Sequence, residues 1–209
     1  MPDGTALLAF VVAALVVLLI PGPGVLYVLA RSLAQGQKAG LVSVLGLSAG
    51  AFLHVVAATV GLSAVLVASA AAFGVVKLLG AAYLIYLGVR AFLTRGSNGY
   101  VEVSAPRSLR RVFRDGVIVS VLNPKIAVFF LAFLPQFADP LRGPVSQQIF
   151  LLGFLYCMLS LCTDGAYALL ASRLRPWLGG PVARSPIPRY ATGTVYVGLG
   201  VSTALAERQ

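Results

Sequence analysis

Residues 6–30 read ALLAFVVAALVVLLIPGPGVLYVLA, an apolar run that is interrupted by Pro21-Gly22-Pro23-Gly24. A helix needs about 17–25 apolar residues to cross a bilayer, so this run is long enough to span one. Proline removes a backbone donor and clashes with the preceding turn, so the run predicts a broken helix. Its second half would begin at Pro23 or Gly24 with unpaired amides, which attract a carboxylate. The alternative interpretation is a structural kink without a ligand.

Five further apolar runs follow, at residues 41–68, 72–93, 116–137, 145–172 and 190–206. Long, continuously apolar runs are typical of spanning helices and lack the alternation of barrel strands. The whole chain is 59% apolar and 11% charged, against about 45–50% and about 25% in soluble domains. The sequence therefore predicts an all-α integral membrane protein with six transmembrane helices in a single transmembrane domain, residues 1–209.

The basic residues lie mainly in alternate gaps between the runs. Arg31 and Lys38 follow the first run, and further arginines follow the third and fifth runs, whereas the other side has only Arg142 and Arg208. The positive-inside rule places the arginine-rich gaps in the cytoplasm and both termini outside it. The net charge of +10 is thereby explained by membrane orientation, and nucleic acid is not an expected partner.

One hydrophilic connection, residues 94–115, separates a first half (1–93) from a second half (116–209). Three spans in each half give the halves opposite orientations, so we expect an inverted repeat with broken first helices. Within the connection, Leu109, Val112 and Phe113 fall on one helical face. They predict either a short interfacial helix against anionic lipid headgroups or a solvated basic loop.

The second half has its own break, at Asn123-Pro124-Lys125. Paired interruptions in corresponding helices indicate the binding site of a transporter. At about 1.5 Å per residue from the flanking arginines, Gly22, Lys125 and Asp164 all fall near the bilayer centre. Lys125 either neutralises Asp164 structurally, or binds a substrate carboxylate while Asp164 takes an ammonium or a coupling proton. Ionisable groups at this depth are functional by default, which favours the second alternative.

Three other side chains are possible cavity-lining residues: His54, Tyr83 and Tyr86. For each of them, packing between helices is the simpler interpretation. Gly46 and Gly50 form a G-x-x-x-G pattern, which predicts a close approach of two helices. The chain contains no H-E-x-x-H, G-x-S-x-G or Walker A motif, so we expect neither an enzyme nor a metal or cofactor site.

Three stretches of the sequence carry recognisable motifs, and they follow one another in a characteristic order along the chain. They are Pro21–Gly24 with Leu26, Ala30-Arg31-Ser32, Gly36 and Gly40; Lys77 to Gly88; and Leu122 to Lys125, followed by Phe129-Phe130 and Phe133 to Phe137. In order and spacing, over nearly the whole chain, they resemble the LysE-type translocator family of amino acid exporters, especially its homoserine/threonine exporter branch.

The resemblance implies a bacterial inner-membrane exporter of amino acids or their derivatives, driven by an ion gradient. The family's first motif maps onto Pro21–Gly24 and its second onto Asn123–Lys125. An acidic residue often seen in the second span of relatives is replaced near Ala51, which argues against basic substrates. We therefore predict a proton-driven exporter of a small zwitterion, with anionic lipids and a second copy as further partners. The alternatives are an exporter of metal cations or other small ions, and an accessory protein or intramembrane enzyme.

Overall fold

The computed structural model describes residues 3–62 and 107–174, together with Val75, Leu78, Ala82, Tyr86 and Val89. These residues form helices and contain no strand. The α-helices are α1 (Gly4–Leu19), α2 (Pro23–Gln35), α3 (Gln37–Ala57), α6 (Leu109–Val121), α7 (Pro124–Val128) and α8 (Val145–Leu174). Shorter segments are the π-helices η1 (Ala58–Leu62) and η2 (Phe129–Phe133) and the 3-10 helices η3 (Leu134–Phe137) and η4 (Pro140–Arg142).

Within the described residues, two helices are long and apolar enough to cross a membrane unbroken, and two bent pairs of helices each match one broken span. The straight spans cover Gln37–Gly61 and Val145–Leu174. α1 meets α2 at an angle of 53°, and α6 meets the segment Pro124–Phe137 at 46°. Pro23 and Pro124 are the first residues of their half-helices, because a proline at this position has no amide to leave unpaired. Both predicted breaks are confirmed.

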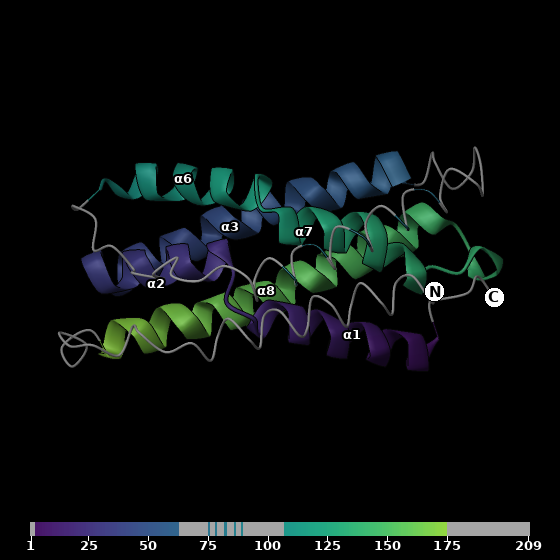
Figure 1. Cartoon of the computed structure of the whole chain (residues 1–209), viewed down its shortest axis with the longest axis horizontal. Coiled ribbons are helices and arrows are strands. Elements are labelled where there is room, and N and C mark those ends of the chain that lie inside the picture. Colours follow the sequence, from purple (N-terminus) through teal and green to yellow (C-terminus); the bar gives the residue numbers. More distant parts are fainter. Residues whose placement is uncertain are drawn as a thin grey trace.

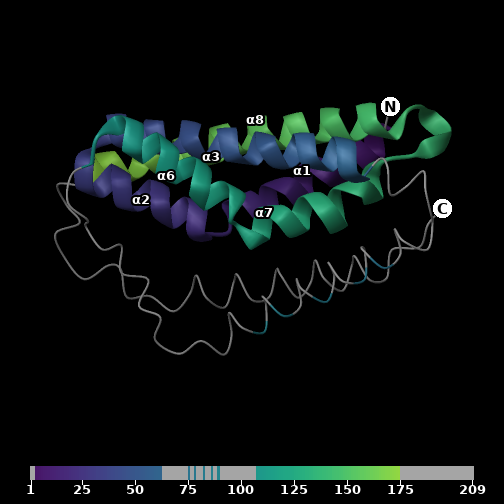
Figure 2. The ribbon, with the colours of Figure 1, turned by 90° about the horizontal axis from the view of Figure 1, so that it is seen from above.

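α3 and α8 run along nearly the full length of the bundle, and the two broken spans pack against them (Figures 1 and 2). The pair α1–α2 runs in the opposite direction to the pair α6–α7 (Figure 1). Opposed directions are what inverted halves require. The relation between the complete halves 1–93 and 116–209, and the connection 94–115, stay predictions, since much of both halves lies outside the described residues.

The apolar runs predicted as spans are helical wherever the structure describes them. Within 72–93, the described positions are helical, and Val75, Leu78, Tyr86 and Val89 are 43–58% exposed. The run 190–206 lies outside the described residues. Elsewhere, large apolar side chains point outward: Leu8 is 65% exposed and Leu122 is 74% exposed. Apolar exposure on this scale suits lipid contact, and the chain is an all-α membrane protein.

The fourth span begins earlier than expected. α6 starts at Leu109, whereas the apolar run starts at Gly116. Val112 is completely buried, and its carbonyl accepts a hydrogen bond of 2.8 Å from the hydroxyl of Tyr27 on α2. Leu109, Val112 and Phe113 therefore belong to a spanning helix. The prediction of a separate interfacial helix or a solvated loop is wrong at these residues, because tertiary contacts continue α6 into the basic segment.

Small residues bring α3 and α6 together. Gly46 and Gly50 on α3 face Gly116 and Ser120 on α6. A Cβ atom on Gly50 would lie 2.5 Å from the Cβ of Ser120, and one on Gly116 would lie 3.2 Å from the Cα of Gly46. Backbones at this separation have no room for larger side chains. The predicted close approach at the G-x-x-x-G pattern is confirmed.

An aromatic cluster fills the bundle between the two breaks and the end that carries Asp3. Rings from α1, η2, η3 and α8 contribute, with centroid separations of 4.6–6.0 Å: Phe10, Phe129, Phe130, Phe133, Phe137 and Tyr156. Tilted and edge-to-face pairs of this kind stabilise a core beyond the area that they bury. The cluster packs η2 and η3 against α1 and α8, and η2 directly continues α7, which carries part of the site described next.

Candidate functional site

The two helix breaks meet inside the bundle. A Cβ atom on Gly22, in the first break, would lie 3.5 Å from the Nζ of Lys125 in the second. A Cβ atom on Gly24 would lie 3.8 Å from the Nδ2 of Asn123. The predicted convergence of the two breaks at one level of the bundle is therefore present in the structure.

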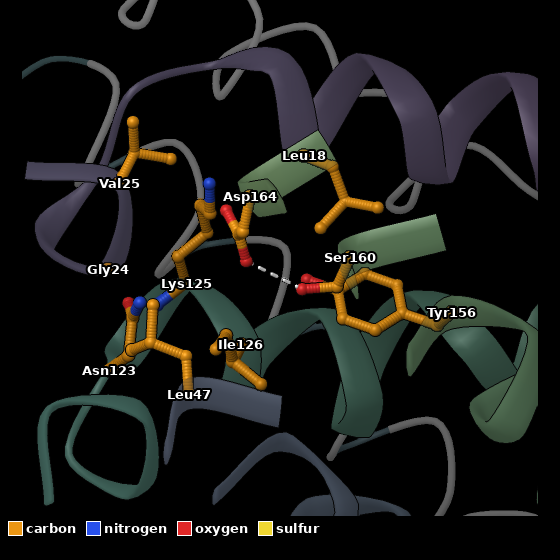
Figure 3. A pocket seen from close by; sticks show the side chains of 10 residues that line it. All are labelled: Leu18, Gly24, Val25, Leu47, Asn123, Lys125, Ile126, Tyr156, Ser160 and Asp164. Carbon is orange, nitrogen blue, oxygen red and sulfur yellow. Dashed lines mark hydrogen bonds between the residues drawn. The ribbon is translucent and has the colours of Figure 1, made fainter. Parts of the chain in front are cut away.

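A cavity lies at this junction (Figure 3). Its volume is about 20 Å³, measured as the space open to the centre of a water-sized sphere, so the cavity is narrow in this structure. Its walls come from α1, α2, α3, α7 and α8 and from the residue preceding α7: Leu18, Gly24, Val25, Leu47, Asn123, Lys125, Ile126, Tyr156, Ser160 and Asp164. Of the predicted binding residues, Gly24, Asn123, Lys125 and Asp164 line it. Pro21, Gly22, Pro23 and Pro124 shape the breaks beside it.

The N-terminus of α2 presents free amides to the cavity. Pro23 has no amide hydrogen, and the amide of Leu26 already bonds to the carbonyl of Gly22 at 3.0 Å. No side chain caps this helix, and the amides of Gly24 and Val25 find no acceptor among the described residues. Unpaired amides and the helix dipole make this end partly positive. A carboxylate is the complementary ligand.

At the N-terminus of α7, in contrast, a side chain caps an amide. The Oδ1 of Asn123 accepts a hydrogen bond of 3.0 Å from the amide of Lys125, and Asn123 is only 3% exposed. Asparagine is among the preferred capping residues because its side-chain oxygen satisfies an orphan amide. The two breaks thus differ, and only the one at Pro23 offers its amides to a ligand.

Removing this cap has a predictable effect on stability. Asn123→Ala is expected to lower the free energy of unfolding by about 1 kcal/mol, measured by thermal unfolding in detergent. Asn123→Ser keeps an acceptor for the amide and should lose much less. Equal losses in both variants would contradict the capping role.

Lys125 caps the end of α1. Its side chain is 6% exposed, and its Nζ donates to the carbonyls of Val17 at 2.9 Å and Ile20 at 3.0 Å. The hydroxyl of Tyr167 donates to the carbonyl of Leu19 at 2.8 Å. These carbonyls are the orphan acceptors of a helix C-terminus, where a cation is favourable. This capping contact was not predicted, although a lysine at the depth of a helix break is a signal for it.

Asp164 faces the same cavity from α8. It is 6% exposed, and its Oδ2 accepts a hydrogen bond of 2.9 Å from the Oγ of Ser160. Lys125 and Asp164 are not joined by an ion pair among the described residues, and Oδ1 receives no hydrogen bond there. Tyr156 and Ser160 were not predicted as site residues, but they precede Asp164 at four-residue spacing, which places all three on one face of α8.

The other predicted side chains lie elsewhere. His54 is outside the lining of this cavity: its Nε2 lies 3.3 Å from the carbonyl oxygen of Ser120, and its ring stacks 6.1 Å from that of Phe130. These contacts fit the interpretation of His54 as a residue that packs between helices. Tyr86 is 54% exposed, and Tyr83 lies outside the described residues. Among the described residues, no three His, Cys, Asp or Glu side chains are grouped so that they could hold a metal ion.

Known membrane proteins are similar in sequence to this chain over nearly its whole length. An uncharacterized membrane protein of Bacillus subtilis, YrhP, is 31% identical over 96% of this chain and 99% of its own length. The homoserine/homoserine lactone efflux protein of Salmonella typhimurium is 30% identical over 95% of this chain and 96% of its own. The leucine efflux protein of the same species is 26% identical over 95% and 94%. No solved structure matches significantly. Residues 15–207 match the LysE type translocator family, and the chain belongs to that family.

Proposed function

We propose that this protein exports a small neutral amino acid, or a close derivative, across the bacterial inner membrane and that a proton gradient drives the export. The observation that carries the proposal is the junction of the two helix breaks. It brings free amides, an ammonium group and a carboxylate together in the lining of one cavity. Relatives named for the efflux of homoserine lactone, homoserine and leucine support the same reading.

The charges suit a zwitterion. The amides of Gly24 and Val25, with the ammonium of Lys125, would hold the substrate carboxylate. The free oxygen of Asp164 would accept the substrate ammonium. The remaining walls include Leu18, Leu47 and Ile126, which favour an uncharged side chain. A basic substrate would need a further acidic group, and Ala51 in the second span is instead buried in the apolar core.

The charge distribution supports the orientation. Arg107, Arg111 and Arg114 gather at one end around Asp115, at N–O separations of 2.8, 4.0 and 3.2 Å. At the opposite end, Asp3 pairs with Arg142 at 3.4 Å. We place the arginine-rich end in the cytoplasm, beside anionic headgroups. Both termini would then lie outside the cytoplasm. Assembly with a second copy is a further prediction.

Asp164 is the proposed proton carrier. Asp164→Asn cannot exchange a proton, so net export driven by an imposed pH gradient is expected to fall at least about tenfold. Ser160→Ala, which removes a hydrogen bond but keeps the carboxylate, should retain gradient-driven export. Flux measurements in proteoliposomes at two imposed gradients check this. Unchanged export by Asp164→Asn would exclude the relay.

The whole proposal is tested by counterflow in proteoliposomes that are preloaded with a mixed pool of isotopically labelled amino acids. Selective exchange of one or a few neutral members, steeper under a proton gradient, is the expected result. If folded protein in both orientations exchanges none of them, amino acid export is wrong, and inorganic ions or other solutes become the candidates.

A further inference from the structure

Arg31 on α2 is a buried cation that has no counterion within residues 3–62 and 107–174. Its side chain is 2% exposed. One guanidinium nitrogen donates to the Oε1 of Gln35 at 3.1 Å, whereas the buried Nε has no hydrogen-bond partner. Among the described residues it forms no ion pair with a carboxylate. Asp115 on α6 is not its counterion, because this carboxylate pairs with Arg107, Arg111 and Arg114.

Burying a guanidinium group without a partner costs free energy, unless a ligand acts as the partner. A buried charge is normally paired and hydrogen-bonded, because desolvation is not otherwise offset. The guanidinium group cannot escape the penalty by losing its proton. Its planar set of donors matches a carboxylate in two parallel hydrogen bonds. The unpaired Nε of Arg31 therefore suits an anionic ligand.

The position of Arg31 connects it to the cavity. Tyr27, Arg31 and Gln35 share one face of α2 at four-residue spacing. Tyr27 bonds to the carbonyl of Val112. The Oε1 of Gln35 accepts from the amide of Arg107 at 3.0 Å, and its Nε2 donates to the carbonyl of Arg107 at 2.7 Å. Arg31 thus lies between two contacts of α2 with the segment 107–112.

The same helix leads from Arg31 to the amides at the break. Arg31 follows Gly24 by roughly 10 Å at 1.5 Å per residue, on the side of the arginine-rich end. Gln35 and Arg107 lie farther toward that end, where two hydrogen bonds between them join α2 to the segment that leads into α6.

We propose that Arg31 is a second carboxylate site, which takes the substrate carboxylate at the cytoplasmic entrance before it moves to the amides of Gly24 and Val25. The Gln35–Arg107 contact closes this entrance in the present structure. The site rests on the proposed function for the identity of its ligand, an amino acid carboxylate. It adds a residue that binds on one side of the membrane only.

The first test is the side dependence of half-saturation in counterflow. Arg31→Gln is expected to raise the half-saturating concentration about tenfold or more from the cytoplasmic side, and less than about twofold from the other. Lys38→Gln, which removes an exposed cation at the same end, is the matched control and should change neither value. An equal rise on both sides, or a fall in maximal rate alone, would show that Arg31 is only structural.

The second test needs no transport, so it separates this site from the proposed function. In a chain with Cys157 and Cys162 replaced by alanine, Gln35→Cys places a thiol one turn from Arg31, and its reaction with a maleimide is timed. Sodium acetate is expected to slow the reaction at least about threefold relative to equimolar sodium chloride. The double variant Gln35→Cys/Arg31→Gln should show no difference between the salts. Equal rates in both salts with Arg31 present would overturn the proposal, even if amino acid counterflow is found.

Discussion

Replacing Lys125 by glutamine is expected to reduce amino acid counterflow by about 100-fold or more. The change removes an ammonium that donates to the carbonyls of Val17 and Ile20. Hydrogen bonds from a charged donor contribute about 1.5–3 kcal/mol each, and every 1.4 kcal/mol is a factor of ten. The variant also leaves Asp164 as the one charged side chain in the lining of the cavity.

The size of this effect follows from the double role that we propose for Lys125. In the present structure its ammonium holds the end of α1 at the break. A substrate carboxylate at the amides of Gly24 and Val25 would compete for the same ammonium. Binding would then loosen α1 relative to α2, and so couple the substrate to a movement at the 53° bend. In transporters with broken helices, the breaks form the substrate site, and one half of the protein rocks against the other around it.

Three measurements separate the role of Lys125 in substrate binding from its role as a cap on α1. Lys125→Arg keeps a cation and should retain measurable counterflow, whereas Lys125→Met, which matches the length without the charge, should resemble Lys125→Gln. Thermal unfolding in detergent reports the loss of the α1 cap in both neutral variants. Counterflow near the wild-type rate in Lys125→Met would show that the lysine neither binds substrate nor controls the break.

The second large effect is expected where α3 crosses α6. Gly50→Ala should lower the free energy of unfolding by about 1–3 kcal/mol, which is typical of an overpacked site. The added Cβ would lie 2.5 Å from the Cβ of Ser120 and 2.7 Å from the carbonyl oxygen of Val117, and a backbone atom cannot move aside alone. Gly50→Leu should prevent the two helices from packing, and the protein should not be recovered folded.

A glycine on α8 is the matched control. Gly165 has no atom within 4 Å of a Cβ placed on it, so Gly165→Ala should leave the unfolding temperature unchanged or raise it, since alanine favours the helix. Thermal unfolding of the two alanine variants in one detergent makes the comparison. A loss in Gly165→Ala as large as in Gly50→Ala would attribute the effect to glycine replacement in general.

Much of the architecture could be predicted from the chain alone. The interruptions at Pro21–Gly24 and Asn123–Lys125 are local chemistry, because proline ends a helix whatever surrounds it. The depth of Gly22, Lys125 and Asp164 follows from counting residues between charges. The start of α6 could not be found in this way, since its first turns are basic and are held by Tyr27 and by packing against Gly46. Apolar composition marks lipid contact, but it does not mark a helix that continues into a basic segment.

The candidate site also has features that the sequence predicts and features that only the tertiary structure shows. The sequence by itself determined that two broken helices would place free amides, a lysine and an aspartate at one level of a membrane bundle, because helix rise and proline geometry are local. Only the tertiary structure decided which partners these groups have. Asn123 caps α7 whereas no side chain caps α2, and Lys125 binds carbonyls of α1 rather than Asp164. Arg31 is buried with no counterion in the part of the chain that the structure describes. Such choices depend on distances between segments as far as 108 residues apart in the chain, which no local pattern specifies.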